Sequence, residues 1–128
     1  MVRHGSVLLG GALGAAARAL LSGVLPAAPL PVGVLVINLV GSLALGYLVA
    51  ISAESILHPD LRLALGTGFL GAFTTFSTLE LGVVLLRAGH GTALAMVYLG
   101  LSLVGGVLAA AAGMALARRG AAGPSGRR

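Results

Sequence analysis

Charged side chains are scarce in this sequence, and cysteine and lysine are absent. Charged residues make up 9% of the 128 residues, whereas a soluble domain carries roughly 25%. Without cysteine the chain can form neither disulfides nor thiolate metal sites. Because so few charges cannot cover the surface of a domain in water, the sequence predicts a membrane protein.

Apolar residues make up 58% of the chain, and the mean hydropathy is +1.08. A helix that crosses the hydrocarbon needs about 20 mostly apolar residues. We therefore predict an all-α membrane protein with one four-span domain, residues 1–117, followed by a basic tail, residues 118–128, that we expect to be disordered. A cleaved signal peptide is the alternative for the first span, but three more spans follow it, so we expect a retained helix. The predicted spans are 5–25, 32–51, 63–86 and 92–117.

Arginine placement predicts the orientation of these spans. The cytoplasmic flanks of membrane helices carry an excess of basic residues. With both termini in the cytoplasm, the inner side holds Arg3, Arg62 and four tail arginines, and the outer side holds Arg87. We expect a multi-pass protein of the cell inner (plasma) membrane with N-in and C-in orientation. The net charge of +5 does not indicate a nucleic acid partner, because the arginines do not gather on one polar face.

Polar residues within the spans are costly and usually have a role. Arg18 is either an interfacial anchor or a charge that attracts anions. Asn38 either forms hydrogen bonds between helices or offers its amide donors to an anion. Glu80 is either a helix-end residue or a proton or cation site. Gly10 and Gly14 form a GxxxG pair, which is typical of closely packed membrane helices.

The stretch GTGFLGAFTTFSTLE, residues 66–80, interrupts the third apolar segment with three glycines and five hydroxyl side chains. These residue types are indifferent or poor helix formers, and TTFST holds more hydroxyls than bonding back to the preceding turn accounts for. We predict that the third helix unwinds here, where freed carbonyls could hold a small hard cation. The literal G-x-G-x-x-G does not indicate a dinucleotide site, because a membrane helix surrounds it and no acidic residue lies about 20 positions on.

Side chains suited to an anion lie near this stretch. The ring edges of Phe73 and Phe76 are electropositive and can face an anion, with apolar contact as the alternative. Tyr98 and Ser102 are four residues apart, so they share a helix face and could form a ladder of hydroxyl donors; a place in the interfacial belt is the alternative for Tyr98. We do not expect an enzyme, since no catalytic constellation is present and the histidines fall in a terminus or in loops.

Three segments resemble the CrcB/Fluc family of fluoride channels: GGALGAAAR (10–18), VINLVGS (36–42) and GFLGAFTTFST (68–78). The resemblance extends from about residue 10 to about residue 102. It implies an antiparallel, dual-topology-type dimer with a broken third helix and fluoride pores between the subunits. It also implies a structural, non-transported sodium ion held by the backbone carbonyls of Gly71 and Thr74. The residues that it matches to the fluoride pore are Asn38, Thr75, Phe76, Ser77, Thr78, Tyr98 and Ser102.

Two features depart from the family pattern. Family members usually carry a second phenylalanine three positions after the first, where this sequence has Leu79, and the change removes one aromatic edge from the pore. A dual-topology homodimer should also have nearly balanced charges, whereas the arginines here favour one orientation. The partner is therefore either a second copy or a sibling subunit inserted in the opposite orientation.

The resemblance implies a passive channel that exports cytoplasmic fluoride and relieves fluoride toxicity, with fluoride and membrane lipid as its partners. Two alternatives belong to other classes. A small four-span multidrug or cation antiporter has a similar length, but it needs a carboxylate in its first span, where this chain has none. A non-transporting assembly subunit would use every polar residue as a contact between helices.

Overall fold

The computed structural model describes residues 2–25, 30–53 and 57–121, and every regular element in these ranges is helical. Four of its helical stretches are long and apolar enough to cross a membrane. The predicted four-span fold is therefore confirmed, and the chain is a multi-pass membrane protein. The four stretches are His4–Val24, Val32–Ala53, Pro59–His90 and Thr92–Gly120.

Three spans are single helices, whereas the third span is divided. The single helices are α1 (Val2–Val24), α2 (Val32–Ala53) and α6 (Thr92–Ala121). The third span consists of α3 (Pro59–Leu63), the π-helix η1 (Ala64–Leu70), α4 (Gly71–Phe73) and α5 (Phe76–His90).

The fourth span is longer than the sequence predicts. Residues 118–121 continue α6, where the prediction places the start of a disordered tail. Alanine and arginine are good helix formers, and arginines near a helix C-terminus interact favourably with the helix dipole. The helix therefore extends past the apolar segment, and the rest of the predicted tail lies outside the described residues.

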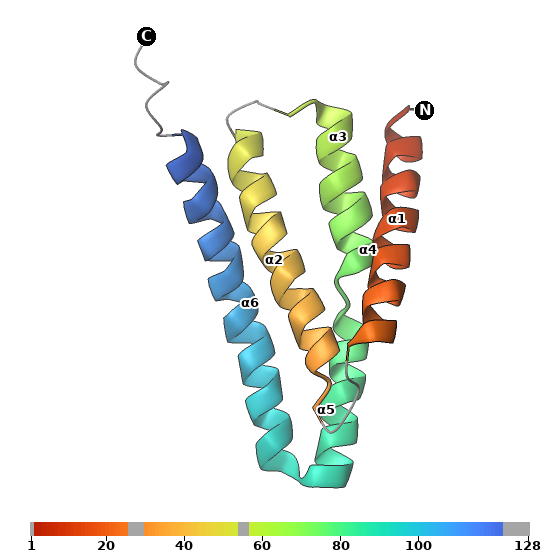
Figure 1. Cartoon of the computed structure of the whole chain (residues 1–128), viewed down its shortest axis with the longest axis vertical. Coiled ribbons are helices and arrows are strands. Elements are labelled where there is room, and N and C mark those ends of the chain that lie inside the picture. Colours follow the sequence, from red (N-terminus) through yellow and green to blue (C-terminus); the bar gives the residue numbers. More distant parts are fainter. Residues whose placement is uncertain (1, 26–29, 54–56, 122–128) are drawn as a thin grey trace.

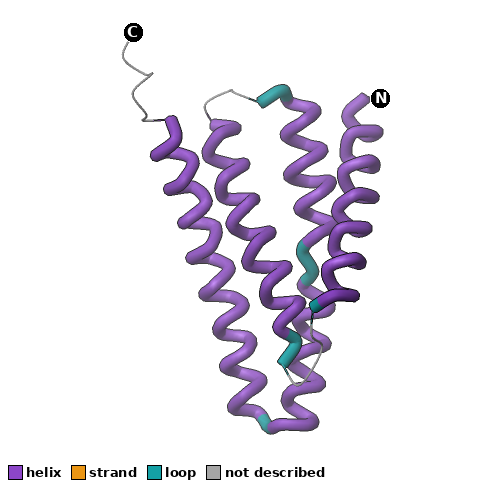
Figure 2. Tube along the Cα trace, viewed as in Figure 1, coloured by secondary structure: helices purple, strands orange, loops and turns teal. Residues whose placement is uncertain are grey.

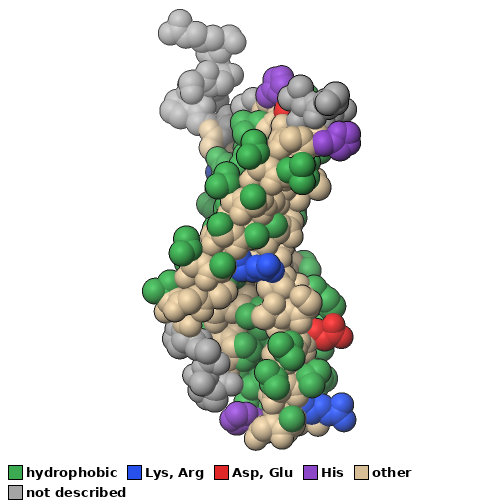
Figure 3. All heavy atoms as spheres, turned by 90° about the vertical axis from the view of Figure 1, so that its right-hand side faces the viewer, with side chains coloured by type: hydrophobic (Ala, Val, Ile, Leu, Met, Phe, Trp, Pro, Cys, Tyr) green, Lys and Arg blue, Asp and Glu red, His purple; other side chains and the backbone are tan. Residues whose placement is uncertain are grey.

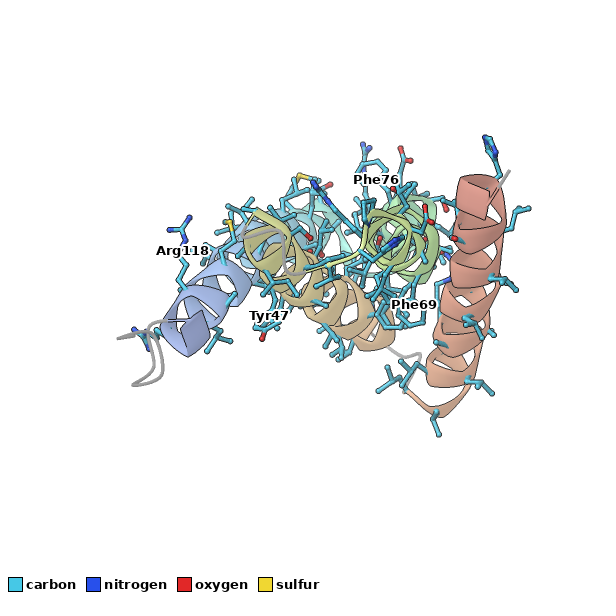
Figure 4. All side chains as sticks on the ribbon, turned by 90° about the horizontal axis from the view of Figure 1, so that it is seen from above. Tyr47, Phe69, Phe76 and Arg118 are labelled. Carbon is cyan, nitrogen blue, oxygen red and sulfur yellow. The ribbon has the colours of Figure 1, made fainter. Side chains whose placement is uncertain are left out.

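The four spans lie side by side in a row (Figure 1). Seen from above, α6 and α1 occupy opposite edges, with α2 and the third span between them (Figure 4). The start of α1, the start of α3 and the C-terminal end of α6 lie at one end of the molecule, and the turn between α5 and α6 lies at the other (Figure 2). This arrangement leaves the two broad faces of the row uncovered.

Glycines set the spacing between neighbouring helices in this row. A Cβ atom on Gly10 would overlap the carbonyl oxygen of Ala64, and one on Gly14 would overlap that of Phe69. The close helix contact predicted for this GxxxG pair is therefore confirmed, between α1 and η1. Between α2 and α6, Gly46 meets the Ala110 carbonyl in the same way. Small residues thus allow backbone contact, as is usual between membrane helices.

A cluster of buried side chains lies where α5 and α6 meet, and it consists of Leu79, Leu86, Ala95 and Tyr98. Other buried side chains, such as Ile37 and Phe73, lie on α2 and on the third span. Many large apolar side chains are exposed, as for Leu20 with 74% of its surface uncovered. On the face shown in Figure 3 apolar side chains occur along the length of the molecule and charged ones are few. An apolar surface of this kind is suited to lipid or to another membrane-spanning chain.

Candidate functional site

The third helix breaks at Thr74 and Thr75, within the stretch where the sequence predicts unwinding. Both residues have extended backbone conformations, with ψ angles of 154° and 122°. The helix before the break ends on Thr74, whose N–H and hydroxyl both donate to the Leu70 carbonyl, at 3.0 and 2.9 Å. After the break, the Thr75 hydroxyl accepts from the Thr78 N–H and caps α5. The predicted break is confirmed, and each side of it is capped by a threonine hydroxyl.

Asn38 of α2 forms two hydrogen bonds with the backbone at the break. Its Oδ1 accepts from the Thr75 N–H at 2.9 Å, and its Nδ2 donates to the Thr75 carbonyl at 2.9 Å. The Thr75 N–H, which no longer belongs to a helix, is thereby paired, and the Thr75 carbonyl, at the N-cap of α5, receives a donor from α2. A carboxamide has a second N–H, and that of Asn38 has no acceptor among the described residues. The structure thus shows the interhelical hydrogen bonds, and it leaves one amide donor for another partner.

Backbone carbonyls at the break lose their helical donors, and those of Gly71 and Thr74 are among them. In a continuous α-helix the N–H groups of Thr75 and Thr78 would bond to the carbonyls of Gly71 and Thr74. Here the Thr75 N–H is directed to Asn38 and the Thr78 N–H to the Thr75 hydroxyl. No other donor to these two carbonyls is present among the described residues. The two carbonyls that the resemblance matches to sodium are therefore among those that the break releases.

The hydroxyls after the break form a cluster around Thr75. Its Oγ1 lies 3.3 Å from the Ser77 Oγ and 3.0 Å from the Thr78 Oγ1. Thr75 is buried, whereas Ser77 and Thr78 are exposed on α5. The buried hydroxyl is thus linked to two hydroxyls on the open face of the helix.

A cavity of about 470 Å³ lies beside the break, between α2, the third span and α6. We call it the central groove. Phe76, the first residue of α5, leaves 67% of its surface exposed. Figure 4 labels its position on the third span. The predicted site residues that line the groove are Asn38, Gly71, Thr74, Thr75, Phe76 and Ser102.

Three predicted pore residues do not line the groove. Ser77 and Thr78 lie on the exposed side of α5. Tyr98 is only 2% exposed, and its hydroxyl donates to the Pro31 carbonyl at 3.5 Å. Ser102 does reach the groove, but its hydroxyl donates to the Tyr98 carbonyl at 2.8 Å. Within a single chain, Tyr98 and Ser102 therefore do not form an exposed ladder of hydroxyls.

Two groove residues have a role that the sequence did not reveal. A Cβ on Gly41 would overlap the Thr74 methyl group, so glycine at this position allows α2 to approach the break closely enough for Asn38 to reach it. The signal was the spacing of Gly41, about one turn after Asn38. Leu79 lines the groove but is also 4% exposed within the α5–α6 cluster. The residue at the second aromatic position therefore belongs partly to the interior of the chain.

Comparison with known proteins matches nearly the whole chain. The family model described as CrcB-like protein, Camphor Resistance (CrcB), covers residues 6–114. The fluoride-specific ion channel FluC of Deinococcus radiodurans is 45% identical over 119 residues, 87% of this chain and 91% of that protein. The FluC protein of Chlorobium phaeobacteroides is 42% identical over 123 residues, 91% of this chain and 95% of that protein. FluC 1 of Moorella thermoacetica is 44% identical over 89 residues, 69% of this chain and 64% of that protein.

Proposed function

The chain belongs to the CrcB family, and from this premise we propose that it is a fluoride-specific ion channel. Fluoride enters cells as the neutral acid and dissociates at cytoplasmic pH. The channel lets the anion leave passively across the inner membrane and so relieves its toxicity. We place both termini in the cytoplasm, because Arg62, Arg118 and Arg119 lie at that end of the spans and Arg87 at the other.

The lining of the central groove carries this proposal. A small, strongly hydrated anion needs donors that replace its water, and a carboxylate on its path would repel it. Asn38 offers an amide N–H, and Phe76 presents its ring at the groove. Among the described residues, no charged side chain lines the groove. These features suit a narrow path for an anion. They do not suit a cation antiporter, which needs a carboxylate to bind its substrate.

We propose that a second subunit completes the pore. Polar side chains at membrane depth normally face protein or water. Ser77, Thr78 and Glu80 are exposed on α5, and Phe76 is the most exposed aromatic residue of the described chain. An antiparallel partner laid against this face, either a second copy or a sibling of opposite orientation, would cover them. The two subunits would then enclose the open side of the groove.

A structural sodium ion fits the break. Sodium prefers oxygen ligands, and the carbonyls of Gly71 and Thr74 line the groove without helical donors. When bound, the ion would supply a fixed positive charge beside the unwound backbone. Thermal unfolding tests this, since a ligand at about 100 times its Kd stabilises the folded state by about 2.7 kcal/mol. The melting temperature should rise when sodium replaces N-methylglucamine, and an unchanged value would remove sodium from the proposal.

Fluoride efflux from liposomes tests the function. Purified protein in sodium-containing liposomes loaded with potassium fluoride should release fluoride after valinomycin is added, and liposomes loaded with chloride should retain it. The assay is run on this chain alone and again with any sibling chain from the same genome. If fluoride stays inside in both preparations, the channel proposal is wrong.

A further inference from the structure

A second cavity lies toward the end of the molecule where α3 begins. It has a volume of about 740 Å³ and lies between the C-terminal half of α2 and the first part of the third span. Its polar lining comes from Ser52, Arg62 and Thr67. The Ser52 hydroxyl already donates to the Leu48 carbonyl at 2.6 Å, which leaves Arg62 and Thr67 as its free donors among the described residues. We call this space the mouth cavity.

The mouth cavity adjoins the central groove. Both spaces are lined by Leu45 and Gly66. A Cβ on Gly66 would stand 3.3 Å from the Leu48 side chain, so glycine keeps the boundary between the two spaces free of a further side chain. The two spaces thus meet at Gly66, between the end of the molecule and the break.

Arg62 is the only charged side chain lining either space in the described part of the chain. It is exposed. The neighbouring acid, Asp60, places its carboxylate 3.9 Å from the His58 imidazole and does not line the mouth cavity. Within the described ranges no carboxylate forms an ion pair with Arg62, so its positive charge acts on the cavity.

Arg62 and Thr67 belong to one face of the third span. The residues of this span that line the mouth cavity beside them are Pro59, Leu63 and Gly66. Positions three and four residues apart lie on the same side of a helix, and these five positions follow that spacing. The cavity therefore has a charged donor at Arg62 and a neutral donor further along the span at Thr67.

We propose that Arg62 is the electrostatic entrance of the fluoride path, raising the local concentration of fluoride in the mouth cavity and passing it by Thr67 toward Asn38. The inference rests on the proposed channel function. A positive charge in a cleft with low-dielectric walls concentrates anions, and salt weakens the effect because the Debye length is about 10 Å at 0.1 M. Arg62 would thus act on fluoride capture at low concentration rather than on transport at saturation.

The absence of cysteine allows a test on the folded protein. Arg62→Cys is reconstituted in liposomes, and fluoride efflux is measured before and after treatment with methanethiosulfonate reagents that attach a positive or a negative group. At low ionic strength and low fluoride, the positive product should carry roughly 10-fold more flux than the negative product. The difference should shrink at high salt and at saturating fluoride. Because one folded preparation is compared with itself, misfolding cannot produce this difference.

Two controls separate the possible failures. The cysteine-free parent should transport fluoride and ignore both reagents; if the parent is inactive, the channel proposal itself fails. Arg87→Cys lies at the other end of the third span and lines neither space, so either reagent should leave its flux unchanged. Equal flux from both Arg62→Cys products, or the same response from Arg87→Cys, would show that Arg62 is only an interfacial anchor.

Discussion

At the scale of single residues, the site depends on one side chain that forms hydrogen bonds with the backbone where the third helix is broken. Asn38 pairs with both the N–H and the C=O of Thr75, each at 2.9 Å. A buried backbone group left without a partner costs about 1–3 kcal/mol. The unwound segment is tolerated at membrane depth in part because α2 supplies an acceptor for the Thr75 N–H that the third helix leaves unpaired.

Replacing Asn38 by leucine should therefore destabilise the folded protein and abolish fluoride transport. Asn38→Leu keeps the approximate volume but removes both hydrogen bonds to Thr75, so unfolding in detergent should become easier by about 2–4 kcal/mol. Ser42→Ala, one turn further along α2 and also at the groove, is the matched control and should change stability little. Circular dichroism melts and liposome efflux measure the two effects. Equal melting curves for the two variants would contradict the role given to Asn38.

Phe76 contributes a ring edge rather than bulk. Phe76→Ile retains an apolar side chain but loses the electropositive edge, whose contacts are worth about 0.5–1.5 kcal/mol. Fluoride flux should fall about 10-fold, which corresponds to about 1.4 kcal/mol, while gel filtration shows an unchanged oligomer. Phe76→Tyr keeps the ring and should retain more flux than the isoleucine variant. If isoleucine and tyrosine transport equally well, the aromatic edge has no part in conduction.

At the scale of elements, the third span works because its parts are held by different neighbours. Residues before the break are held by α1, through the contacts of Gly10 and Gly14 with the backbone of η1. The break itself is held by Asn38 of α2, and α5 after it shares a buried cluster with α6. The position of the groove therefore depends on helices far from its lining.

A methyl group at the contact between α1 and η1 should be enough to disturb it. A Cβ on Gly14 would overlap the Phe69 carbonyl, whereas one on Gly23, in the same helix, would meet nothing within 4 Å. Gly14→Ala should lower stability by about 1–3 kcal/mol, the usual cost of overpacking. Gly23→Ala should be neutral or slightly stabilising, because alanine is the better helix former. Thermal unfolding of both variants measures the difference in stability. Equal melting temperatures would show that α1 can move away from η1 without loss of stability.

The sequence predicts elements better than it predicts which way their side chains face. The four spans follow from apolar run lengths, and the break follows from glycine and threonine crowded into a helix. The placement of Tyr98 does not, because helical spacing aligns it with Ser102 but cannot show that its ring enters the α5–α6 cluster and reaches Pro31. The π-helix was missed as well. A π-helix is a local widening of an α-helix, and the length of an apolar run does not distinguish the two.

At the scale of the whole molecule, the row of helices has a polar strip on an open face. Large apolar side chains are exposed along the spans, and the polar side chains Ser77, Thr78 and Glu80 of α5 are exposed with them. Lipid can cover the apolar part of such a surface but not Ser77, Thr78 and Glu80. The second subunit proposed above would bring polar groups or water to that face, and its orientation would decide which groups meet.

Orientation can be read from two single cysteines, since the chain has none of its own. His90→Cys is exposed at the α5–α6 end, and Ala53→Cys is exposed at the end of α2. The arginine bias places position 90 outside and position 53 inside. In spheroplasts an impermeant maleimide should therefore label nearly all of His90→Cys, and should label Ala53→Cys only after lysis. Such a fixed orientation would require a sibling subunit to complete an antiparallel pore. Half-labelling of both variants would instead mean that copies insert both ways and that the chain pairs with itself.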